Sequence, residues 1–325
     1  MTRGQAASAM DRSQLLSWVA SLYYEEELTQ AQIASRLHTS RSTVSRLLQE
    51  ARDKEIVEIV IHPVWRRDRE LEKQLVEVFG VVEARVLVEP RLDYRKVLRG
   101  LGALAARYLD AVVAPHTILG ISWGTALRST VRALTPADEV PITVVQMIGA
   151  TGARDPLTDG PELARLLADR YGGRYRSLHA PLAVESVDTK EALFKEPHIR
   201  ETLEMARRAD LALVGVGTVI PEYSSWLRAG YIDREGLADL RAVGAVGDIC
   251  GWHYDVYGNV LDIDLNRRIV GVEPEAFSRI DRVIAVAGGQ PKVRPILGAL
   301  RGGFVDVIIT DEQAARGVLG SLENG

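Results

Sequence analysis

The sequence has little of what marks several common classes of protein. Its 325 residues include one cysteine, Cys250, so no disulfide can form within the chain. Such cysteine use is typical of a reducing compartment, and the apolar run around Cys250 favours a packing role for the thiol over a reactive one. No apolar run reaches the roughly 18 residues that a membrane-spanning helix needs. The first ten residues lack the apolar core of a secretory signal, so we predict a disordered tail and a cytoplasmic protein without a membrane partner.

Strong charge of either sign is absent too. The formal net charge is −4, the hydrophobic fraction is 46% and the charged fraction is 26%, as in ordinary globular proteins. The net charge of the whole chain does not indicate a nucleic-acid-binding protein, although a chain with a negative net charge can still carry a local basic face. At roughly 150 residues per domain, the length predicts about two domains.

The N-terminal part contains three closely spaced helical patterns. Apolar residues at helical spacing predict helices at 12–26, 30–37 and 41–52. Thr29 and Ser40 stand directly before the second and third helices, where a hydroxyl caps a helix N-terminus. Two short helices joined by a tight turn and braced by another helix make a helix-turn-helix.

The third predicted helix carries polar and basic residues opposite its apolar stripe. Residues 36–54 contain five basic and two acidic side chains, a local net charge of +3. Recognition helices present such residues to base edges and phosphates in the major groove of DNA. The predicted DNA-binding residues are Thr29, Gln30, Thr39, Ser40, Arg41, Ser42, Thr43, Ser45 and Arg46. A three-helix bundle with a solvated basic face fits the periodicity equally well, so the pattern alone leaves both interpretations open.

The segment after these helices changes character. Residues 55–61 form a β-type run, which predicts a strand beside the helices or the wing of a winged helix-turn-helix. Residues 64–79 then follow a helical pattern that begins with three arginines, and we interpret them as a connector and a candidate dimer contact. We therefore predict a DNA-binding domain at 1–63 and an effector-binding domain at 64–325.

From about residue 81 onward, short β-branched runs alternate with helical patterns. We predict strands at 84–88, 117–121, 142–146, 211–216, 282–287 and 305–309, and helices at 93–109, 125–134, 162–171, 199–208, 290–300 and 312–322. This alternation favours an α/β fold with a Rossmann-like, doubly wound parallel sheet covered by helices on both faces. Ligands of such sheets bind beyond the carboxyl ends of the strands, so the loops there are the candidate site.

Three of these loops have features of an anion site. The residues are Ser122, Trp123, Gly124 and Thr125 in the first loop, Gly215 and Gly217 in the second, and Lys292 in the third. The first loop leads from a strand into a helix whose N-terminal N–H groups favour a phosphate. The glycines permit close approach of a ligand. Lys292 opposes the dipole of its helix unless an anion lies nearby. Each feature also has an interpretation without a ligand: the first loop as a capped turn, the second as a turn packed in the core, and Lys292 as a solvated surface residue.

Other polar residues carry less weight. Four histidines are scattered along the sequence without the spacing of metal ligands, so we predict no metal site. They are His62, His116, His179 and His198. His253 is as consistent with a core or surface role as with shaping a pocket. Asp311 precedes a predicted helix, and its position favours a helix cap over a ligand contact.

The order of the motifs resembles a known family. The string LTQAQIASRLHTSRSTVSRLLQEA resembles the helix-turn-helix of the SorC/DeoR-like sugar-responsive regulators. LGISWGTAL, VVQMIGATG, ADLALVGVGTVI, GAVGDICGWHYDVYGNV, AVAGGQPKVRPILGALRGG and IITDEQAA then resemble the motifs of that family's effector domain. This domain is similar in fold to glucosamine-6-phosphate deaminase and ribose-5-phosphate isomerase. The sequence departs from the family pattern at His38, where such turns often have Gly or Asn, and at Ala126, where Thr is frequent.

The resemblance implies a function and roles for single residues. It implies a repressor of a carbohydrate catabolic operon, homodimeric or homotetrameric and without a cofactor, whose affinity for double-stranded operator DNA responds to a sugar or sugar phosphate. The implied effector-binding residues are Ser122, Trp123, Gly124 and Thr125 as phosphate loop, Lys292 as phosphate-binding lysine, Asp248 as sugar contact, and Gln146, Gly149, Gly215 and Gly217 as pocket lining.

The alternative function is a sugar-phosphate isomerase or deaminase with an accessory DNA-binding head. That chemistry needs a general base beside the substrate carbons. Related deaminases carry an acidic pair where this chain has the segment QMIG, at residues 146–149, which contains no carboxylate. We therefore predict that the chain is not an enzyme. An architectural nucleic-acid protein would need a strong positive charge, which is missing.

Overall fold

The chain forms two compact units, Met1–Val64 and Trp65–Gly325, which we name unit 1 and unit 2. The computed structural model describes residues 11–26, 28–54, 56–57, 65–88, 93–152 and 156–323. The predicted tail at 1–10 and most of the predicted strand at 55–61 lie outside the described residues. The predicted domain boundary falls one residue before the division between the units.

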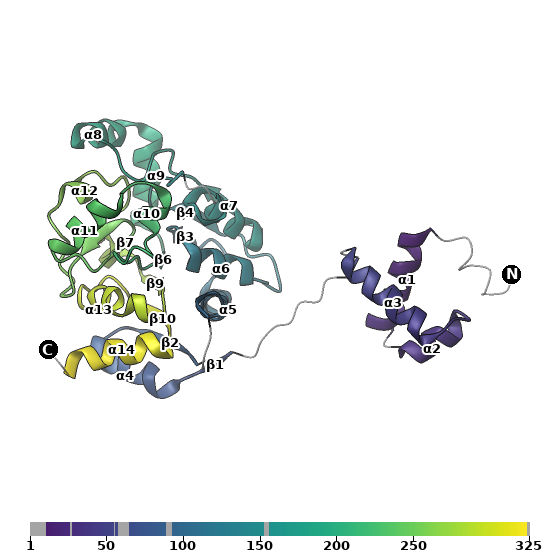
Figure 1. Cartoon of the computed structure of the whole chain (residues 1–325). Helices are drawn as coiled ribbons and strands as arrows, with labels where there is room; N and C mark the ends of the chain where they lie inside the picture. The colour runs from purple at the N-terminus through teal and green to yellow at the C-terminus, as the bar shows by residue number, and fades with distance from the viewer. Residues whose placement is uncertain are drawn as a thin grey trace. The chain divides into compact units, whose positions relative to one another are not determined.

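Unit 1 contains the three helices that the periodicity predicts. They are α1 (Arg12–Tyr24), α2 (Gln30–Arg36) and α3 (Arg41–Asp53) (Figure 1). The Thr29 and Ser40 hydroxyls cap α2 and α3 by accepting hydrogen bonds from the backbone N–H groups of Gln32 and Thr43. Apolar side chains from all three helices form one buried cluster, which holds these short helices together.

The turn between α2 and α3 is tight although it lacks glycine. His38 adopts a left-handed backbone conformation, with φ 51°. The Thr39 N–H donates to the Ala34 carbonyl oxygen over 2.9 Å and closes the turn. A residue with a Cβ pays roughly 1–2 kcal/mol for this conformation, which Gly and Asn adopt more easily. The departure from the family pattern at His38 thus leaves the turn intact under local strain.

Replacing His38 by asparagine should therefore stabilise unit 1. We expect His38→Asn to add about 0.5–1 kcal/mol, because Asn tolerates the left-handed region. Hydrogen exchange of amides 34–44 in the full chain would measure this as several-fold slower exchange. His38→Ala serves as the control and should bring no gain, since alanine is strained in the same way.

Unit 2 is built on one eight-stranded sheet with the order β1-β2-β10-β9-β6-β3-β4-β5. The strands are β1 (Arg66–Arg67), β2 (Glu83–Val88), β3 (Ile118–Ile121), β4 (Thr143–Gln146), β5 (Arg174–Arg176), β6 (Leu211–Gly215), β9 (Arg282–Val286) and β10 (Val307–Asp311). All pairings are parallel except that of β1 with β2. β7 (Gly247–Ile249) and β8 (Trp252–Tyr254) form a separate antiparallel pair.

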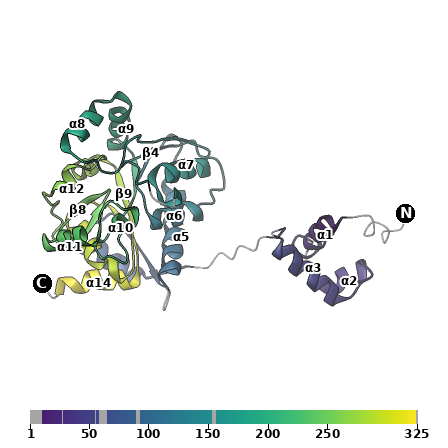
Figure 2. The same cartoon turned by 45° about the horizontal axis from the view of Figure 1, so that its top comes forward.

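Helices cover both faces of this sheet, because successive side chains of its strands enter two different cores. In β6, Leu211 and Leu213 belong to one apolar cluster, and Ala212 and Val214 belong to the other. α5 (Tyr94–Val112), α6 (Thr125–Ala133) and α7 (Gly160–Tyr171) pack on the first face; α4 (Arg69–Phe79), α9 (Pro197–Arg207), α13 (Val293–Arg301) and α14 (Glu312–Glu323) contribute to the second cluster. Both views show α5, α6 and α7 together on one side of the strands (Figures 1 and 2). The predicted doubly wound sheet is confirmed.

Several elements differ from the sequence prediction. The helix predicted at 64–79 begins only at Arg69, because Arg66 and Arg67 pair with the edge of β2 and Asp68 caps α4. The helix predicted at 290–300 opens with a 3₁₀ turn, Gln290–Lys292. The helices that the prediction missed are α8 (Val187–Lys195), α10 (Ser225–Ala229), α11 (Arg234–Ala242) and α12 (Asp264–Arg267). They are short: α8 buries no residue, and α11 buries only Leu237 and Leu240, so their sequences carry little of the apolar periodicity on which the prediction depends.

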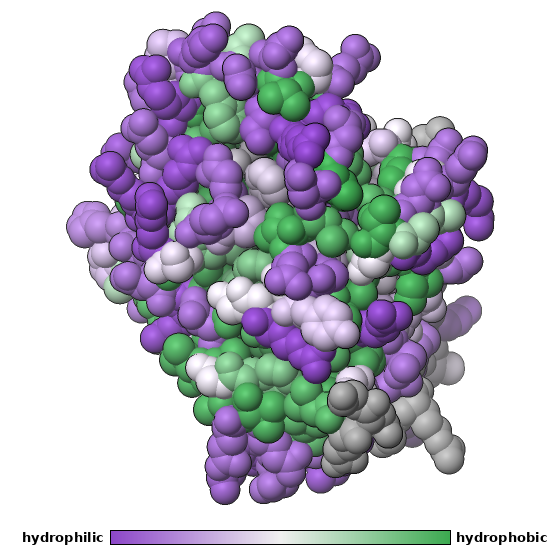
Figure 3. Space-filling model, turned by 90° about the vertical axis from the view of Figure 1, so that its left-hand side faces the viewer, coloured by the Kyte–Doolittle hydropathy of each residue, from purple (hydrophilic) through white to green (hydrophobic). Residues whose placement is uncertain are grey.

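One face of unit 2 is mainly polar. Figure 3 shows one face on which hydrophilic residues predominate, with a hydrophobic area in its lower part. The most exposed valines include Val82, at 62%, and Val243, at 55%. Among the described helices, none combines the length and the apolar character that crossing a membrane requires.

Candidate functional site

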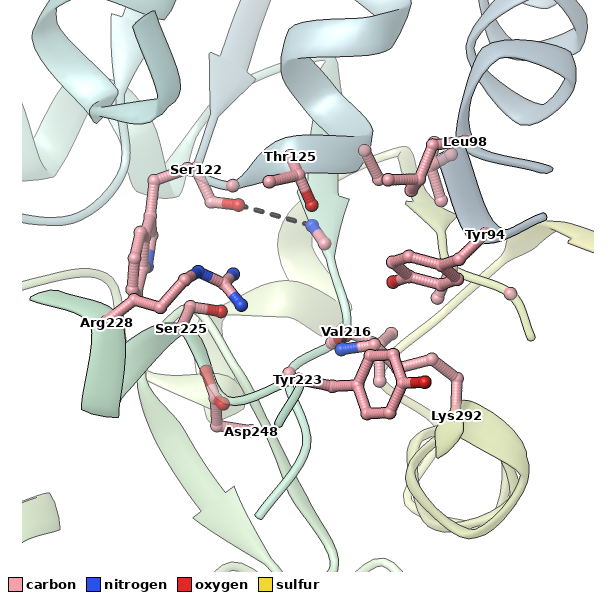
Figure 4. A pocket seen from close by; sticks show the side chains of 18 of the residues that line it. Tyr94, Leu98, Ser122, Thr125, Val216, Tyr223, Ser225, Arg228, Asp248 and Lys292 are labelled. Atoms are coloured by element: carbon pink, nitrogen blue, oxygen red, sulfur yellow. Dashed lines mark hydrogen bonds between the residues drawn. The ribbon is translucent and has the colours of Figure 1, made fainter. Parts of the chain in front are cut away.

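A cavity of about 500 Å³ opens beyond the carboxyl ends of β3, β6 and β9. β3 and β6 are neighbours from which the chain proceeds to opposite edges of the sheet, so the cavity lies at a topological switch point. The predicted effector residues that line it are Ser122, Trp123, Gly124, Thr125, Gly215, Gly217, Asp248 and Lys292. Figure 4 shows Thr125, Arg228 and Lys292 approaching this cavity from different elements.

The first loop connects β3 to the N-terminus of α6. Gly124 has φ 123° and is the N-cap residue of α6, and Thr125 is the first helical residue. The Ser122 Oγ accepts a hydrogen bond of 3.3 Å from the Gly215 N–H, so this hydroxyl ties the end of β3 to the end of β6 (Figure 4). Gly124 provides no side-chain cap, which leaves the N–H groups of the first turn of α6 available for an anion.

Lys292 is a buried cation at the wall of the cavity. Its side chain reaches across to the second loop, where Nζ donates a hydrogen bond of 2.6 Å to the Val216 carbonyl oxygen. Burial lowers the pKa of the ammonium group to about 8; the nearby carboxylate of Asp248 opposes this decrease, and the positive charge of Arg228 adds to it. Lys292 and Arg228 thus face one cavity, which Arg95 also lines, and a bound anion would stabilise this arrangement.

Asp248 lies on β7 with 6% of its surface exposed. Its backbone carbonyl accepts a hydrogen bond of 2.7 Å from the Gly217 N–H. A Cβ on Gly217 would lie 1.7 Å from the Asp248 Oδ1, so only glycine permits this approach. The second glycine of the predicted loop therefore makes room for a buried carboxylate, which can accept hydrogen bonds from the hydroxyl groups of a ligand.

The remaining two predicted effector residues, Gln146 and Gly149, do not line the cavity. The Gln146 amide is fully buried, donates to the Ile148 carbonyl oxygen over 2.6 Å and accepts from the Leu178 N–H over 2.9 Å. A Cβ on Gly149 would lie 2.1 Å from the Pro181 carbonyl oxygen. Both residues hold the chain after β4 in place, so we assign them a structural role.

Sequence reasoning missed several lining residues. They are Tyr94, Arg95, Leu98, Ala126, Val216, Glu222, Tyr223, Ser225, Arg228, Val286, Ala287 and Gly288. Tyr94 and Tyr223 come from α5 and from the loop after β6, and their rings meet edge to face with centroids 5.4 Å apart. Burial raises the pKa of Tyr94. Arg228 sits on α10, a five-residue helix without a recognisable motif. The one feature of the sequence that could have indicated Arg228 is its position in the segment that follows the loop with Gly215 and Gly217.

Three other residues singled out from the sequence have clear places. Cys250 is buried against the cavity, and burial raises the pKa of its thiol, which fits the predicted packing role. His253 is also buried, and burial lowers its pKa, which favours the neutral form of the ring. The Asp311 carboxylate caps α14 by accepting from the N–H groups of Gln313 and Ala314. The described residues contain no group of three or more side chains arranged to hold a metal ion.

The predicted DNA-binding residues divide into two groups. Thr29 and Ser40 use their hydroxyls as helix caps. Of the others, Arg41, Ser42, Ser45 and Arg46 are exposed on α3, whereas Gln30, Thr39 and Thr43 are half-buried. Within the described chain, neither Arg41 nor Arg46 forms an ion pair. Arg36, by contrast, pairs with Glu26 over 3.1 Å, which removes its charge from the basic face.

Family comparisons agree with this division into two units. Residues 65–320 match the family described as "Putative sugar-binding domain", and residues 19–54 match the family described as "Sigma-70, region 4". The deoxyribonucleoside regulator of Bacillus subtilis (strain 168) is 35% identical over 312 residues, covering 96% of this chain and 99% of that protein. The sorbitol operon regulator of Klebsiella pneumoniae is 30% identical over 314 residues, covering 94% and 97%.

Solved structures show the same similarity. The full-length sorbitol operon regulator SorC from Klebsiella pneumoniae matches with a TM-score of 0.73 and 30% identity, over 95% of this chain and 99% of that one. A DeoR family transcriptional regulator from Listeria monocytogenes matches with a TM-score of 0.70 and 28% identity, over 77% and 98%.

Proposed function

Because the chain belongs to the SorC/DeoR-type family of sugar-binding transcriptional regulators, we propose that a sugar phosphate in the cavity of unit 2 controls operator binding by unit 1. The protein is a DNA-binding regulator and not an enzyme. The phosphorylated nature of its effector, repression as the direction of control, and a homodimeric or homotetrameric state are parts of the proposal.

The observation that carries the proposed phosphate site is the buried ammonium group of Lys292. Its burial is costly unless a negative charge compensates it. Asp248 is the one carboxylate that raises its pKa, and Arg228 works in the opposite direction. The N-terminus of α6 faces the same cavity, and helix N-termini favour phosphate. A phosphate bound between Thr125 and Lys292 would satisfy all of these groups.

The sugar part would occupy the rest of the cavity. The Asp248 carboxylate would accept hydrogen bonds from sugar hydroxyls, and Tyr94 and Tyr223 would provide an aromatic wall. The Bacillus subtilis relative is named a deoxyribonucleoside regulator and the Klebsiella pneumoniae relative a sorbitol operon regulator. We propose a small phosphorylated carbohydrate as the class of effector for this chain.

A thermal-shift screen tests the chemistry of the cavity. Purified full-length protein is heated with a panel of sugar phosphates and with the parent sugars. A ligand at 100 times its dissociation constant stabilises the folded state by about 2.7 kcal/mol, which such a screen detects. We expect stabilisation by at least one sugar phosphate and none by its parent sugar. Stabilisation by unphosphorylated sugars alone would overturn the assignment of the phosphate site.

Effector affinity should depend on pH in a defined way. In the protein without effector, Lys292 loses its proton near pH 8, whereas phosphate monoesters lose their second proton near pH 6. We expect the highest affinity between about pH 6 and 8, with a decrease approaching tenfold per pH unit above 8. Titration calorimetry at several pH values measures this. Without effector, stability should rise as pH increases above 8, because unfolded Lys292 then binds more protons than folded Lys292.

Arg41 tests the DNA-binding surface. It is exposed in the first turn of α3 and free of ion pairs within the described chain. We expect Arg41→Ala to weaken operator binding by about 1–3 kcal/mol if Arg41 contacts a base. Arg36→Ala is the matched control, since Arg36 already pairs with Glu26. Equal operator affinity for wild type and Arg41→Ala, measured by fluorescence anisotropy, would remove Arg41 from the readout.

A further inference from the structure

Trp65 is the first residue of unit 2 and directly follows unit 1 in the sequence. Its indole is half-buried and packs against the apolar cluster beneath α5. A Cβ on Gly100 of α5 would lie 3.1 Å from the Trp65 Cε3 and 2.5 Å from the Leu87 Cδ2. Trp65 and Leu87 thus press directly on the backbone of α5, at a position where only glycine fits.

The same helix forms a wall of the cavity. Tyr94 and Leu98, in its first two turns, line the cavity. The Tyr94 ring also packs on Gly289, where an added Cβ would lie 3.2 Å from the ring atom Cε2. Gly100 follows Tyr94 by six residues, roughly 9 Å along the axis at 1.5 Å per residue. A helix moves as a stiff rod over this distance, so a shift at Tyr94 moves the surface on which Trp65 rests.

A second connection runs through the sheet. Arg67 of β1 pairs with Leu87 of β2, and Leu87 pairs in turn with Asp311 of β10. The Asp311 carboxylate accepts a hydrogen bond from the Gly289 N–H, in the loop that carries Lys292. The cavity loop and the start of unit 2 are therefore joined by three successive contacts, from Gly289 to Asp311, Leu87 and Arg67.

The backbone next to Trp65 is held in place. The Arg67 guanidinium forms two hydrogen bonds to Glu72, of 2.6 and 2.9 Å, and the Glu72 carboxylate also accepts the Val86 N–H over 3.0 Å. Glu72 is 6% exposed, so this ion pair is sheltered from water. The hydrogen bonds of Arg67 fix the position of β1. Trp65, two residues earlier, contacts α5 and can therefore shift when α5 shifts.

We propose that Trp65 is a positioning residue that transmits the state of the effector cavity, through α5, to the segment leading to unit 1. The inference rests on the proposed function of the cavity, to which it adds the route of control. Thermodynamic coupling is reciprocal, so a change at Trp65 must also alter the cavity when no effector is bound. This second consequence can be measured without knowing the effector.

Cys250 is a built-in reporter for that measurement, because it is the only cysteine and lies buried against the cavity. We expect the thiol of full-length Trp65→Ala to react with a thiol reagent about tenfold faster than that of wild type, through local opening of the cavity. Trp65→Phe should restore slow labelling. Leu163→Ala is the matched control, since Leu163 of α7 is buried in the cluster on which Trp65 packs, does not line the cavity and lies outside the cluster that contains Cys250.

Equal labelling rates for Trp65→Ala and Leu163→Ala would show a general loss of stability and overturn the inference. Should Trp65→Ala fail to fold, Gly100→Ala probes the same contact from the other side, because its methyl group would lie 2.5 Å from the Leu87 Cδ2 and 3.1 Å from the Trp65 Cε3 and would push both side chains away from α5. Faster Cys250 labelling in Gly100→Ala supports the inference, and wild-type labelling contradicts it.

Hydrogen exchange with inorganic phosphate and with ribose 5-phosphate separates this inference from the proposed function. In wild type, we expect slower exchange at residues 288–292 and also at 65–68. In Trp65→Phe both effects should remain, whereas in Trp65→Ala only the cavity should respond. Protection at 288–292 without any change at 65–68 in wild type would overturn the role of Trp65. No protection at 288–292 by either probe, together with fast Cys250 labelling in Trp65→Ala, would count against the phosphate site alone.

Discussion

Lys292→Met is expected to weaken sugar-phosphate binding by about 100-fold or more, because a buried charge-assisted hydrogen bond contributes up to about 3 kcal/mol. Methionine keeps much of the length and apolar character of the lysine side chain, so the wall of the cavity should stay closed. Removing the buried charge removes its desolvation cost but also leaves the Val216 carbonyl oxygen without its donor, so the stability of the ligand-free protein should stay within about 1–2 kcal/mol of wild type. Titration calorimetry with a stabilising sugar phosphate measures the loss of affinity.

Arg294→Met is the control for this substitution. Arg294 lies two residues further on, is exposed and does not line the cavity. Effector affinity should be unchanged in this variant, and operator affinity without effector should be unchanged in both. A Lys292→Met protein that binds the sugar phosphate as tightly as wild type would move the phosphate elsewhere in the cavity, with Arg228 as the next cation to test.

The second large effect is expected from Gly149→Ala, and it concerns folding. The added methyl group would meet the backbone of Pro181 and Ala180, at 2.1 Å from one carbonyl oxygen. Backbone atoms cannot move aside as a flexible side chain can, so we expect a loss of about 3 kcal/mol or more in the free energy of unfolding of unit 2. Urea unfolding of the full chain measures this loss.

Gly320→Ala provides the matched control, because a Cβ at Gly320 in α14 meets no atom within 4 Å. Alanine is the better helix former, so this variant should gain up to about 1 kcal/mol. The fraction of Gly149→Ala that folds should bind effector with wild-type affinity, since Gly149 is absent from the cavity wall. A specific loss of effector affinity with normal stability would restore Gly149 to the site.

The sequence predicted the parts of the site that have strong local signatures. The loop from Ser122 to Thr125 joins a strand to a helix, and Lys292 conflicts with the dipole of its own helix; both signals are physical and local. Asp248 came from the resemblance to the family. The loop from Ser122 to Thr125 and Lys292 line one cavity because parallel strands deliver their carboxyl ends to one edge of the sheet. Asp248 reaches the same cavity from β7, in the separate antiparallel pair.

Residues that depend on three-dimensional packing were less predictable. Gln146 ends β4 beside the strands that form the cavity, as a ligand-binding residue could, yet its amide forms hydrogen bonds with the backbone of Ile148 and Leu178. Arg228 reaches the cavity from a five-residue helix that no periodicity indicates. The helix expected from residue 64 onward gave way to β1 at Arg66, because the edge of β2 offered backbone hydrogen bonds that a sequence pattern cannot reveal.

The central claim is that occupancy of the cavity in unit 2 changes DNA binding by unit 1. Its most direct test is the anisotropy of a labelled DNA duplex, selected from a random pool by the wild-type protein, titrated with and without each sugar phosphate that stabilises the chain. We predict that at least one of them changes DNA affinity by about tenfold, within the usual range of 1–3 kcal/mol for allosteric coupling, and that Lys292→Met abolishes the change. DNA affinity that stays constant when a sugar phosphate saturates the cavity would contradict the claim.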